Sequence, residues 1–200
     1  MAPRVVDKEQ KRKEIAVTCS DLIHEMGIKK LTVAQVAKKA GIGKGTIYEY
    51  FENKDDIVFE IMNNHIDDYH KEFLETIKDA DSTKQKVFHF FKFVTDDNLE
   101  NLKHFNGYRE YLSIVLGDDN HAMKKFNSKC NIFFNNQLRI FIKEGIVKNE
   151  LISESINFVD SLLIFEKGVA LMKMTQDDFD AKSSCELYIN TLFDFIEVKK

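Results

Sequence analysis

The stretch Thr32–Phe51, TVAQVAKKAGIGKGTIYEYF, carries the most specific structural signal in the chain, because its small, flexible and apolar residues are spaced as in a helix-turn-helix. Two helices that cross steeply at short range need a small residue where their backbones approach, and Ala37 supplies it. The sharp turn between them needs a residue that tolerates positive φ, and Gly41 supplies it. Ile47 then returns an apolar side chain onto the first helix. This spacing predicts a helix-turn-helix.

The first helix of the motif also carries a start signal. Thr32 is suited to the N-cap position, where its hydroxyl can accept from a free backbone N–H. Gln35 follows three residues later, at the position where a capping box prefers Glu or Gln. The apolar floor of the motif is expected to be completed by Val36, Ala40, Ile42 and Phe51.

The second helix, expected over residues 44–50, presents a different chemistry on its exposed side. Lys44, Thr46, Tyr48 and Tyr50 project from it, and Lys, Thr and Tyr side chains are donors suited to phosphate oxygens. In such motifs the N-terminal residues of the second helix face base edges, which makes Lys44 the candidate for reading guanine. The alternative is an ordinary helical hairpin, with Tyr48 and Tyr50 as packed aromatic residues.

The run LTVAQVAKKAGIGKGTIYEYFENKDDI, residues 31–57, closely resembles the DNA-binding signature of the TetR family of bacterial regulators. The residues that match the family pattern are Thr32, Ala37, Ala40, Gly41, Gly45, Tyr48, Phe51, Asn53 and Lys54. The sequence departs from the pattern at Tyr50, where the family often has His, and at Gly43, where it often has Ser. Glu49 would repel phosphate if it faced DNA, so we expect it to point away.

The resemblance implies a role for each matching residue. Thr32, Tyr48, Tyr50 and Lys54 would contact phosphates, and Lys44, Gly45 and Thr46 would form the base-facing end of the recognition helix. The full predicted DNA-binding set is Thr32, Val33, Gln35, Gly43, Lys44, Gly45, Thr46, Tyr48, Tyr50 and Lys54.

Charge is distributed unevenly along the chain, whose net charge is −4. Residues 1–55 carry 11 Lys and Arg against 8 Asp and Glu, a net charge of +3, and residues 56–200 carry 18 against 25, a net charge of −7. The basic part coincides with the predicted phosphate-facing surface. Chance scatter of solvated charges would also produce such an asymmetry.

The whole chain is predicted to be all-α, because it has only one proline and eight glycines and shows no sustained period-two alternation. We expect about nine helices: a three-helix DNA-binding domain over residues 1–53 and a larger helical effector-binding and dimerisation domain over residues 54–200. The expected helices cover residues 7–26, 33–39, 44–50, a run that starts near 53, and 82–99, 102–116, 120–144, 153–174 and 178–198, with Gly117 and Gly145 as stops.

The second domain is rich in aromatic residues, which favours a pocket for an apolar or aromatic ligand. A solid core is the alternative. The candidate pocket residues are Phe88, Phe91, His104, Tyr108, Tyr111, Phe133, Phe134 and Gln137.

The last two helices are the predicted dimer interface, because two such helices from each subunit form a four-helix contact with two-fold symmetry. Gly168 lies inside the first of them, where a glycine marks a close approach of helices. The candidate interface residues are Leu162, Phe165, Gly168, Val169, Leu192 and Phe195.

Other site classes find no support in the sequence. Cys19, Cys130 and Cys185 are too far apart for a zinc motif or a disulfide framework, and His65 and His70 are five residues apart rather than the four that align two ligands on a helix. We therefore predict no metal, no cofactor and no catalytic residues. The chain shows no secretory signal and no membrane span, and we expect it in the cytoplasm.

These observations lead to one functional hypothesis and two alternatives. The hypothesis is a homodimeric repressor that a small apolar or aromatic effector releases from a palindromic operator, by shifting the fourth helix and so the spacing of the recognition helices. The alternatives are a ligand-independent activator or architectural DNA binder, and a helical enzyme whose helix-turn-helix is incidental.

Overall fold

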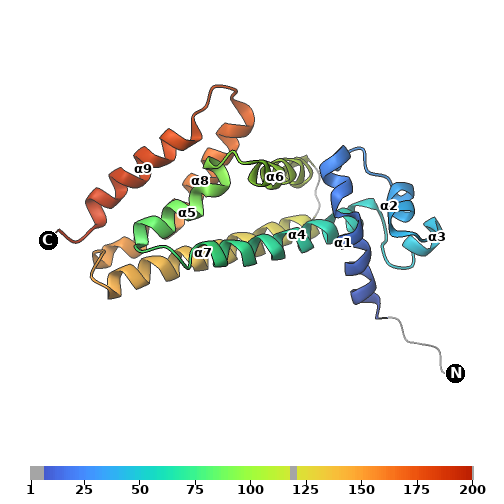
Figure 1. The fold of residues 1–200 in the computed structure, drawn as a ribbon, viewed down its shortest axis with the longest axis horizontal. Coiled ribbons are helices and arrows are strands. Elements are labelled where there is room, and N and C mark those ends of the chain that lie inside the picture. The colour runs from blue at the N-terminus through green and yellow to red at the C-terminus, as the bar shows by residue number, and fades with distance from the viewer. Residues whose placement is uncertain (1–6, 118–120, 200) are drawn as a thin grey trace. The chain divides into compact units, whose positions relative to one another are not determined.

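The computed structural model describes residues 7–117 and 121–199. The first six residues of the predicted DNA-binding domain therefore lie outside the described part, as do the side chains of His24, His65 and Ala122. The described residues form nine α-helices, one 3-10 helix and no strand, which confirms the predicted all-α class (Figure 1). The elements are α1 (Lys8–Met26), α2 (Val33–Ala40), α3 (Lys44–Ile47), α4 (Lys54–Thr76), α5 (Thr83–Thr95), α6 (Leu99–Gly117), α7 (His121–Val147), η1 (Ser153–Phe158), α8 (Val159–Thr175) and α9 (Ala181–Ile196).

Contacts along the chain define two compact units. The first comprises Met1–Lys71 and Asn106–Met123, and the second comprises Glu72–Phe105 and Lys124–Lys200. Helices α4 and α6 therefore each contribute to both units. The predicted division after residue 53 is a division by function and stays a prediction.

The core of the first unit is formed where α1 packs on α2 and α2 packs on α3. The apolar residues of α1 recur at helical spacing and are all buried: Ile15, Ala16, Cys19, Leu22 and Ile23. Helix α1 ends at Gly27, whose φ of 78° is a conformation that glycine adopts readily. The Glu110 carboxylate of α6 lies against Gly27 and accepts a hydrogen bond from the Ile28 N–H, so a side chain at position 27 would displace it.

The second unit is built from α5, α8 and α9, which contact one another, and from α7. Phe73, Phe90 and Phe134 contact one another edge to face, with ring centroids 5.7–6.4 Å apart. The Phe141 ring lies 6.2 Å from Phe73. These rings form a continuous aromatic cluster between helices that are far apart in the sequence.

Helix α7 does not stop at Gly145, as the sequence suggested, but continues to Val147. The chain turns at Asn149, whose φ is 58°, and the Glu150 N–H donates to the Gly145 carbonyl at 2.8 Å. Gly145 has a different role, because a Cβ there would collide with the Thr83 hydroxyl and crowd Leu151. The glycine allows a close approach of α7 to the start of α5.

Candidate DNA-binding surface

The first helix of the motif, α2, begins with the predicted capping box. The Thr32 hydroxyl accepts from the Gln35 N–H at 3.3 Å, and the Gln35 side-chain oxygen accepts from the Thr32 N–H at 2.8 Å. Two otherwise unsatisfied N–H groups are paired in this way. The capping box therefore determines where α2 starts.

The turn after α2 has the conformation that the sequence predicted. Gly41 is in the left-handed region, with φ 68° and ψ 26°, and the Ile42 N–H donates to the Ala37 carbonyl at 3.0 Å. Ala37 is 5% exposed and Ile47 is fully buried. The small residue, the turn and the returning apolar side chain thus occupy the positions expected for a helix-turn-helix.

The recognition helix is shorter than predicted. Regular α-helix ends at Ile47, and the N–H groups of Tyr48, Glu49 and Tyr50 donate to carbonyls three residues earlier, at 3.0–3.2 Å. Such tightened turns are common at helix C-termini. The tightening leaves Tyr48 51% exposed while Phe51, three residues on, is buried.

The residues before and inside α3 are open to solvent. Gly43, Lys44 and Gly45 are exposed, and Thr46 is half-buried. A Cβ added at Gly45 would have no neighbour within 4 Å, so the fold itself does not require glycine there. This openness is compatible with the base-facing position that the family resemblance implies for Gly45.

The predicted phosphate contacts differ in their availability. Tyr48 is exposed, which argues against the alternative that it is a packed aromatic residue, whereas Tyr50 is half-buried. Thr32 is exposed, but its hydroxyl is engaged with Gln35. The Lys54 amine donates to the Lys29 carbonyl at 3.1 Å, which leaves two of its three hydrogens for another acceptor. Val33 and Gln35, at the start of α2, are half-buried.

An arginine that the sequence analysis did not single out holds this region together. The Arg12 guanidinium of α1 donates to both carboxylate oxygens of Asp56, at 2.7 and 3.0 Å, and to the Tyr50 carbonyl at 2.5 Å. It also donates to Glu60 at 3.2 Å and lies over the Phe51 ring, 4.5 Å from its centroid. Arg12 therefore links α1, the end of the recognition segment and α4.

The charges of this cluster stabilise one another. Hydrogen bonding to Arg12 lowers the pKa of Asp56, and hydrogen bonding to Asp56 raises the pKa of Arg12. A sequence signal for the cluster exists, since Asp56 and Glu60 are four residues apart and share one face of α4. The sequence does not indicate which cation faces that pair.

A groove of about 680 Å³ opens beside the recognition segment within the first unit. Charged side chains of both signs line it: the basic ones are Lys8 and Arg12, and the acidic ones include Glu49, Glu52 and Asp55. Tyr48 and Tyr50, two of the predicted phosphate contacts, also line this groove, where the nearby carboxylates would repel an anion.

The predicted effector-pocket residues do not all fall in one unit. Phe91 is buried, Phe133 and Phe134 contact each other with ring centroids 5.2 Å apart, and Phe88, His104 and Gln137 are half-buried; all six belong to the second unit. Tyr108 and Tyr111 belong to the first unit, where the Tyr111 hydroxyl donates to the Met123 carbonyl at 2.7 Å. The ligand pocket remains a prediction.

The predicted dimer residues fall into two groups. Leu162, Val169 and Leu192 are buried inside the second unit, and Phe165 stacks on Tyr188 with ring centroids 3.8 Å apart. Gly168 and Phe195 are exposed. Ile164, Leu171 and Leu187, which lie outside the predicted interface set, are 69%, 55% and 70% exposed. Their helical spacing from Gly168 and Phe195 is the signal that could have found them.

None of the helices in the described part of the chain has both the length and the apolar character that crossing a bilayer requires.

Residues 19–61, which contain the whole motif, match the family model described as bacterial regulatory proteins, tetR family. The chain is 32% identical over 87 residues to the HTH-type transcriptional regulator HbdR of Aromatoleum sp. (strain CIB), a match that covers 44% of this chain and 37% of HbdR. It is 32% identical over 97 residues to the fatty acid metabolism regulator protein of Bacillus subtilis (strain 168), covering 46% of this chain and 50% of that protein. The match thus spans half or less of the length of each relative.

The fold has solved counterparts over almost the whole chain. A TetR-family transcriptional regulator from Cytophaga hutchinsonii superimposes with a TM-score of 0.74 at 16% identity, covering 98% of this chain and 100% of that one. The regulator FadR of Bacillus subtilis, in complex with stearoyl-CoA, superimposes with a TM-score of 0.61 at 21% identity, covering 90% and 96%.

The sequence relatives are transcriptional regulators, and the DNA-binding motif, the family model and the fold agree. Residues 19–61 therefore carry a DNA-binding segment of the tetR family of bacterial regulatory proteins, within a chain that has the fold of TetR-family regulators.

Proposed function

We propose that this protein is a transcriptional regulator that binds a palindromic DNA operator through α2 and α3. The observation that carries the proposal is the capped, glycine-turned pair of helices that leaves Lys44 and Tyr48 exposed beside the turn. Its activity would be binding rather than catalysis, and it would act in the bacterial cytoplasm, where the DNA is.

A DNA-binding measurement tests this proposal directly. The purified protein selects its site from a random pool of DNA duplexes, and fluorescence anisotropy then gives the affinity for that site across a salt series. We expect a steep salt dependence, because phosphate contacts release counterions. Lys44→Ala should weaken binding by ~1–3 kcal/mol if Lys44 reads a base edge.

A matched control is Lys129→Ala, which removes an exposed lysine of α7 in the second unit and should leave affinity unchanged. If wild type selects no DNA sequence, or if Lys44→Ala and Lys129→Ala bind DNA equally well, the proposal that α2 and α3 bind an operator is wrong.

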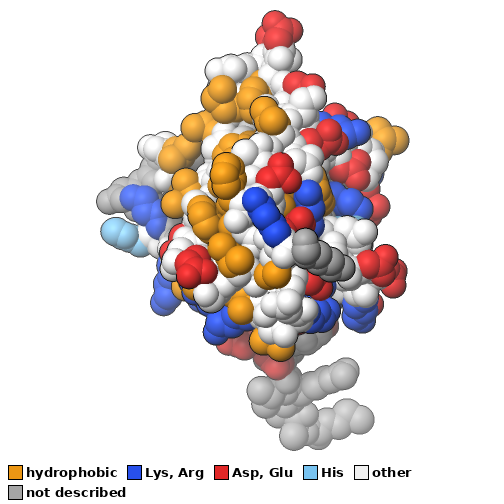
Figure 2. Space-filling model, turned by 90° about the vertical axis from the view of Figure 1, so that its left-hand side faces the viewer, with side chains coloured by type: hydrophobic (Ala, Val, Ile, Leu, Met, Phe, Trp, Pro, Cys, Tyr) orange, Lys and Arg blue, Asp and Glu red, His pale blue; other side chains and the backbone are white. Residues whose placement is uncertain are grey.

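We propose that the regulator works as a homodimer formed through α8 and α9. Figure 2 shows hydrophobic side chains in a band across the face of the molecule on which α9 lies in Figure 1. On these two helices the exposed apolar residues are Ile164, Leu171, Met172, Leu187 and Phe195. Gly168, between Ile164 and Leu171, has open space where a Cβ would be, so its own unit does not require a glycine there. A second copy of the chain packed closely against this face would require a glycine at that position.

Sedimentation velocity tests the dimer. Leu187→Asp places a charge in the band and should convert the protein to monomers, because burying an unpaired carboxylate is costly. Val17→Asp changes a 55% exposed residue of α1 and should leave the dimer intact. Monomeric wild type at micromolar concentration would contradict the proposal.

We propose further that an apolar effector binds the second unit and releases a repressed operator. The aromatic cluster around Phe73, Phe90 and Phe134 supports an apolar ligand, as does the likeness to FadR in complex with stearoyl-CoA. Stearoyl-CoA is therefore the first probe, and coenzyme A, which lacks the acyl chain, is its control. Release of bound DNA by the former alone supports an acyl effector. No response to apolar compounds would favour a ligand-independent regulator with a solid core.

A further inference from the structure

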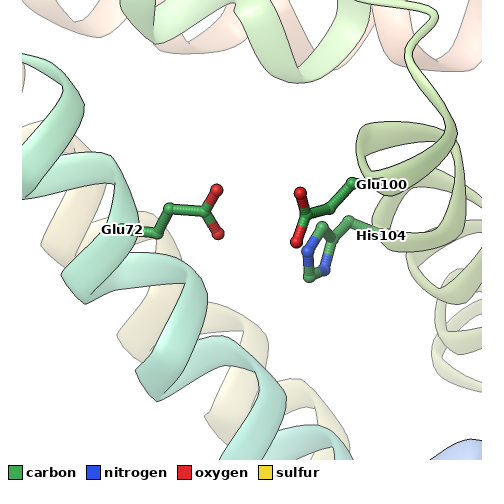
Figure 3. Close-up of side chains that lie close together, drawn as sticks. All are labelled: Glu72, Glu100 and His104. Atoms are coloured by element: carbon green, nitrogen blue, oxygen red, sulfur yellow. The ribbon is translucent and has the colours of Figure 1, made fainter.

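Three side chains with metal-ligating groups converge from two helices of the second unit. Glu72 lies on α4, and Glu100 and His104 lie on α6 (Figure 3). One potential ligand atom from each residue can be chosen so that all three atoms lie within 4.8 Å of one another. In Figure 3 the Glu72 carboxylate points across the gap toward the carboxylate of Glu100 and the ring of His104.

The local structure explains why the three groups meet. Glu100 and His104 are four residues apart on α6, so they occupy the same face of that helix one turn apart. Glu72 lies in the last turn but one of α4 and supplies a third ligand from a separate element. Residues four apart on one helix are neighbours in any such helix, so their proximity alone is weak evidence for a site. A third ligand from a separate helix is brought there only by the fold, and it therefore makes the case for a site stronger.

The charges at this place favour a bound cation. Two carboxylates that point toward each other repel, and a divalent cation between them would convert this repulsion into attraction. Glu72 and Glu100 are exposed and His104 is half-buried, so water can reach the site. Three protein ligands with open positions for water are the arrangement of many accessible metal sites.

We propose that Glu72, Glu100 and His104 bind a divalent first-row transition-metal ion, for which Zn²⁺ is the probe. An imidazole nitrogen suits zinc and its neighbours in the row, whereas Mg²⁺ and Ca²⁺ prefer sites made of oxygen ligands alone. The bound ion joins the end of α4 to the start of α6. The expectation of no metal rested on the spacing of cysteines and histidines, whereas Glu72 is 28 residues from Glu100 in the chain, and no short spacing links them.

Isothermal titration calorimetry on the full, untagged chain tests the site, after treatment with a chelator and its removal. We expect wild type to bind one Zn²⁺ per chain. His104→Gln and Glu72→Gln should each weaken that binding at least about tenfold. Loss of a residue that only hydrogen-bonds to a metal ligand already lowers metal affinity by a factor of ~10–100. His121→Gln and Glu75→Gln are matched controls, with a histidine and a glutamate outside the cluster, and should bind as wild type does.

A second measurement uses thermal unfolding. Zn²⁺ should raise the Tm of wild type and of the two controls, because it binds the folded chain, and it should leave the Tm of His104→Gln almost unchanged. Mg²⁺ at the same concentration should have no comparable effect. Absence of saturable Zn²⁺ binding by wild type, equal losses in the control variants, or equal affinity for Mg²⁺ would each overturn the proposal. None of these measurements involves DNA, so their outcome is independent of the test of DNA binding through α2 and α3.

Discussion

The two units of the protein present different chemistry to their surroundings. Beside α3, the first unit exposes Lys44, the hydroxyl of Tyr48 and glycine backbone, over a core that is closed by Ile47 and Phe51. The second unit leaves Ile164, Leu187 and Phe195 largely exposed on α8 and α9, in addition to its buried aromatic cluster. One surface suits a polar, negatively charged partner, and the other suits an apolar partner such as a second copy of the chain. Substitutions at these surfaces and in the two cores should separate what each unit needs to fold from what it uses to bind.

The largest effect on stability is expected at Phe51, which is 1% exposed and lies under the Arg12 guanidinium. Phe51→Ala should lower the free energy of unfolding by ~3–5 kcal/mol, because it removes a buried ring and leaves a cavity. Tyr48→Ala, three residues earlier, should cost less than ~1 kcal/mol but should still weaken DNA binding. Urea unfolding and DNA titration of both variants test the distinction. Equal destabilisation by the two would mean that Tyr48 is part of the core.

Gly41 and Gly168, both exposed, should respond to substitution with opposite signs. Gly41→Ala should destabilise the first unit by ~1–2 kcal/mol, because an alanine at φ 68° is strained. Gly168→Ala should stabilise α8 by up to ~1 kcal/mol, because glycine is a poor residue inside a helix and the added Cβ meets open space.

The same Gly168→Ala variant sharpens the dimer proposal. If two copies approach closely at α8, the variant should dissociate at higher concentration than wild type even though each chain is more stable. Unfolding in urea gives the stability, and sedimentation equilibrium gives the dissociation constant. An unchanged constant would place the close contact elsewhere on the apolar band.

The Arg12 cluster should give a pH-dependent contribution of about 1–2 kcal/mol, because the groups are partly exposed. The pKa of Asp56 is lowered in the folded protein, so its stabilising effect is present above the ordinary carboxyl range and is lost as pH falls through the lowered pKa. Asp56→Asn should therefore be less stable than wild type at pH 7, and the difference should shrink toward pH 3. Unfolding curves across that range test it, with Asp55→Asn, an exposed neighbour, as control.

The smallest expected effect concerns the three cysteines, which should differ only in the rate at which a thiol reagent labels them. Burial raises the pKa of Cys19 to about 11, and burial together with Glu166 and Glu186 raises that of Cys185 to about 12. Both thiols should stay protonated and unreactive at pH 8 in the folded protein. Cys130, which is half-buried, should react first with a thiol reagent. Fast labelling of Cys19 or Cys185 without denaturant would show that its unit opens locally.

The head could be predicted closely because its determinants are local. The capping box at Thr32, the left-handed Gly41 and the buried Ile47 each depend on neighbours within a few residues, and the structure confirms all three. The end of α3 was predicted less well, because nothing in the residues 48–50 themselves shows that their hydrogen bonds tighten. Whether the predicted side chains contact DNA stays a prediction for the binding experiment.

The second unit could be predicted only in outline. Helical periodicity identified its helices, but Gly145 looked like a stop and is instead a contact point with Thr83. Likewise the apolar residues of α8 and α9 could be listed, yet only the folded unit shows that Leu162 and Leu192 are inside while Leu187 and Phe195 are outside.

Hydrophobic periodicity, helix caps and positive-φ glycines act over one or two helical turns, so the all-α class, the order of the helices and the helix-turn-helix follow from the residues alone. Only the folded chain shows that Arg12 meets Asp56, which apolar face remains exposed, and that Glu72 faces Glu100 and His104. Each of these depends on helices that are distant in the chain, and their meeting is set by the packing of the whole unit rather than by any local pattern.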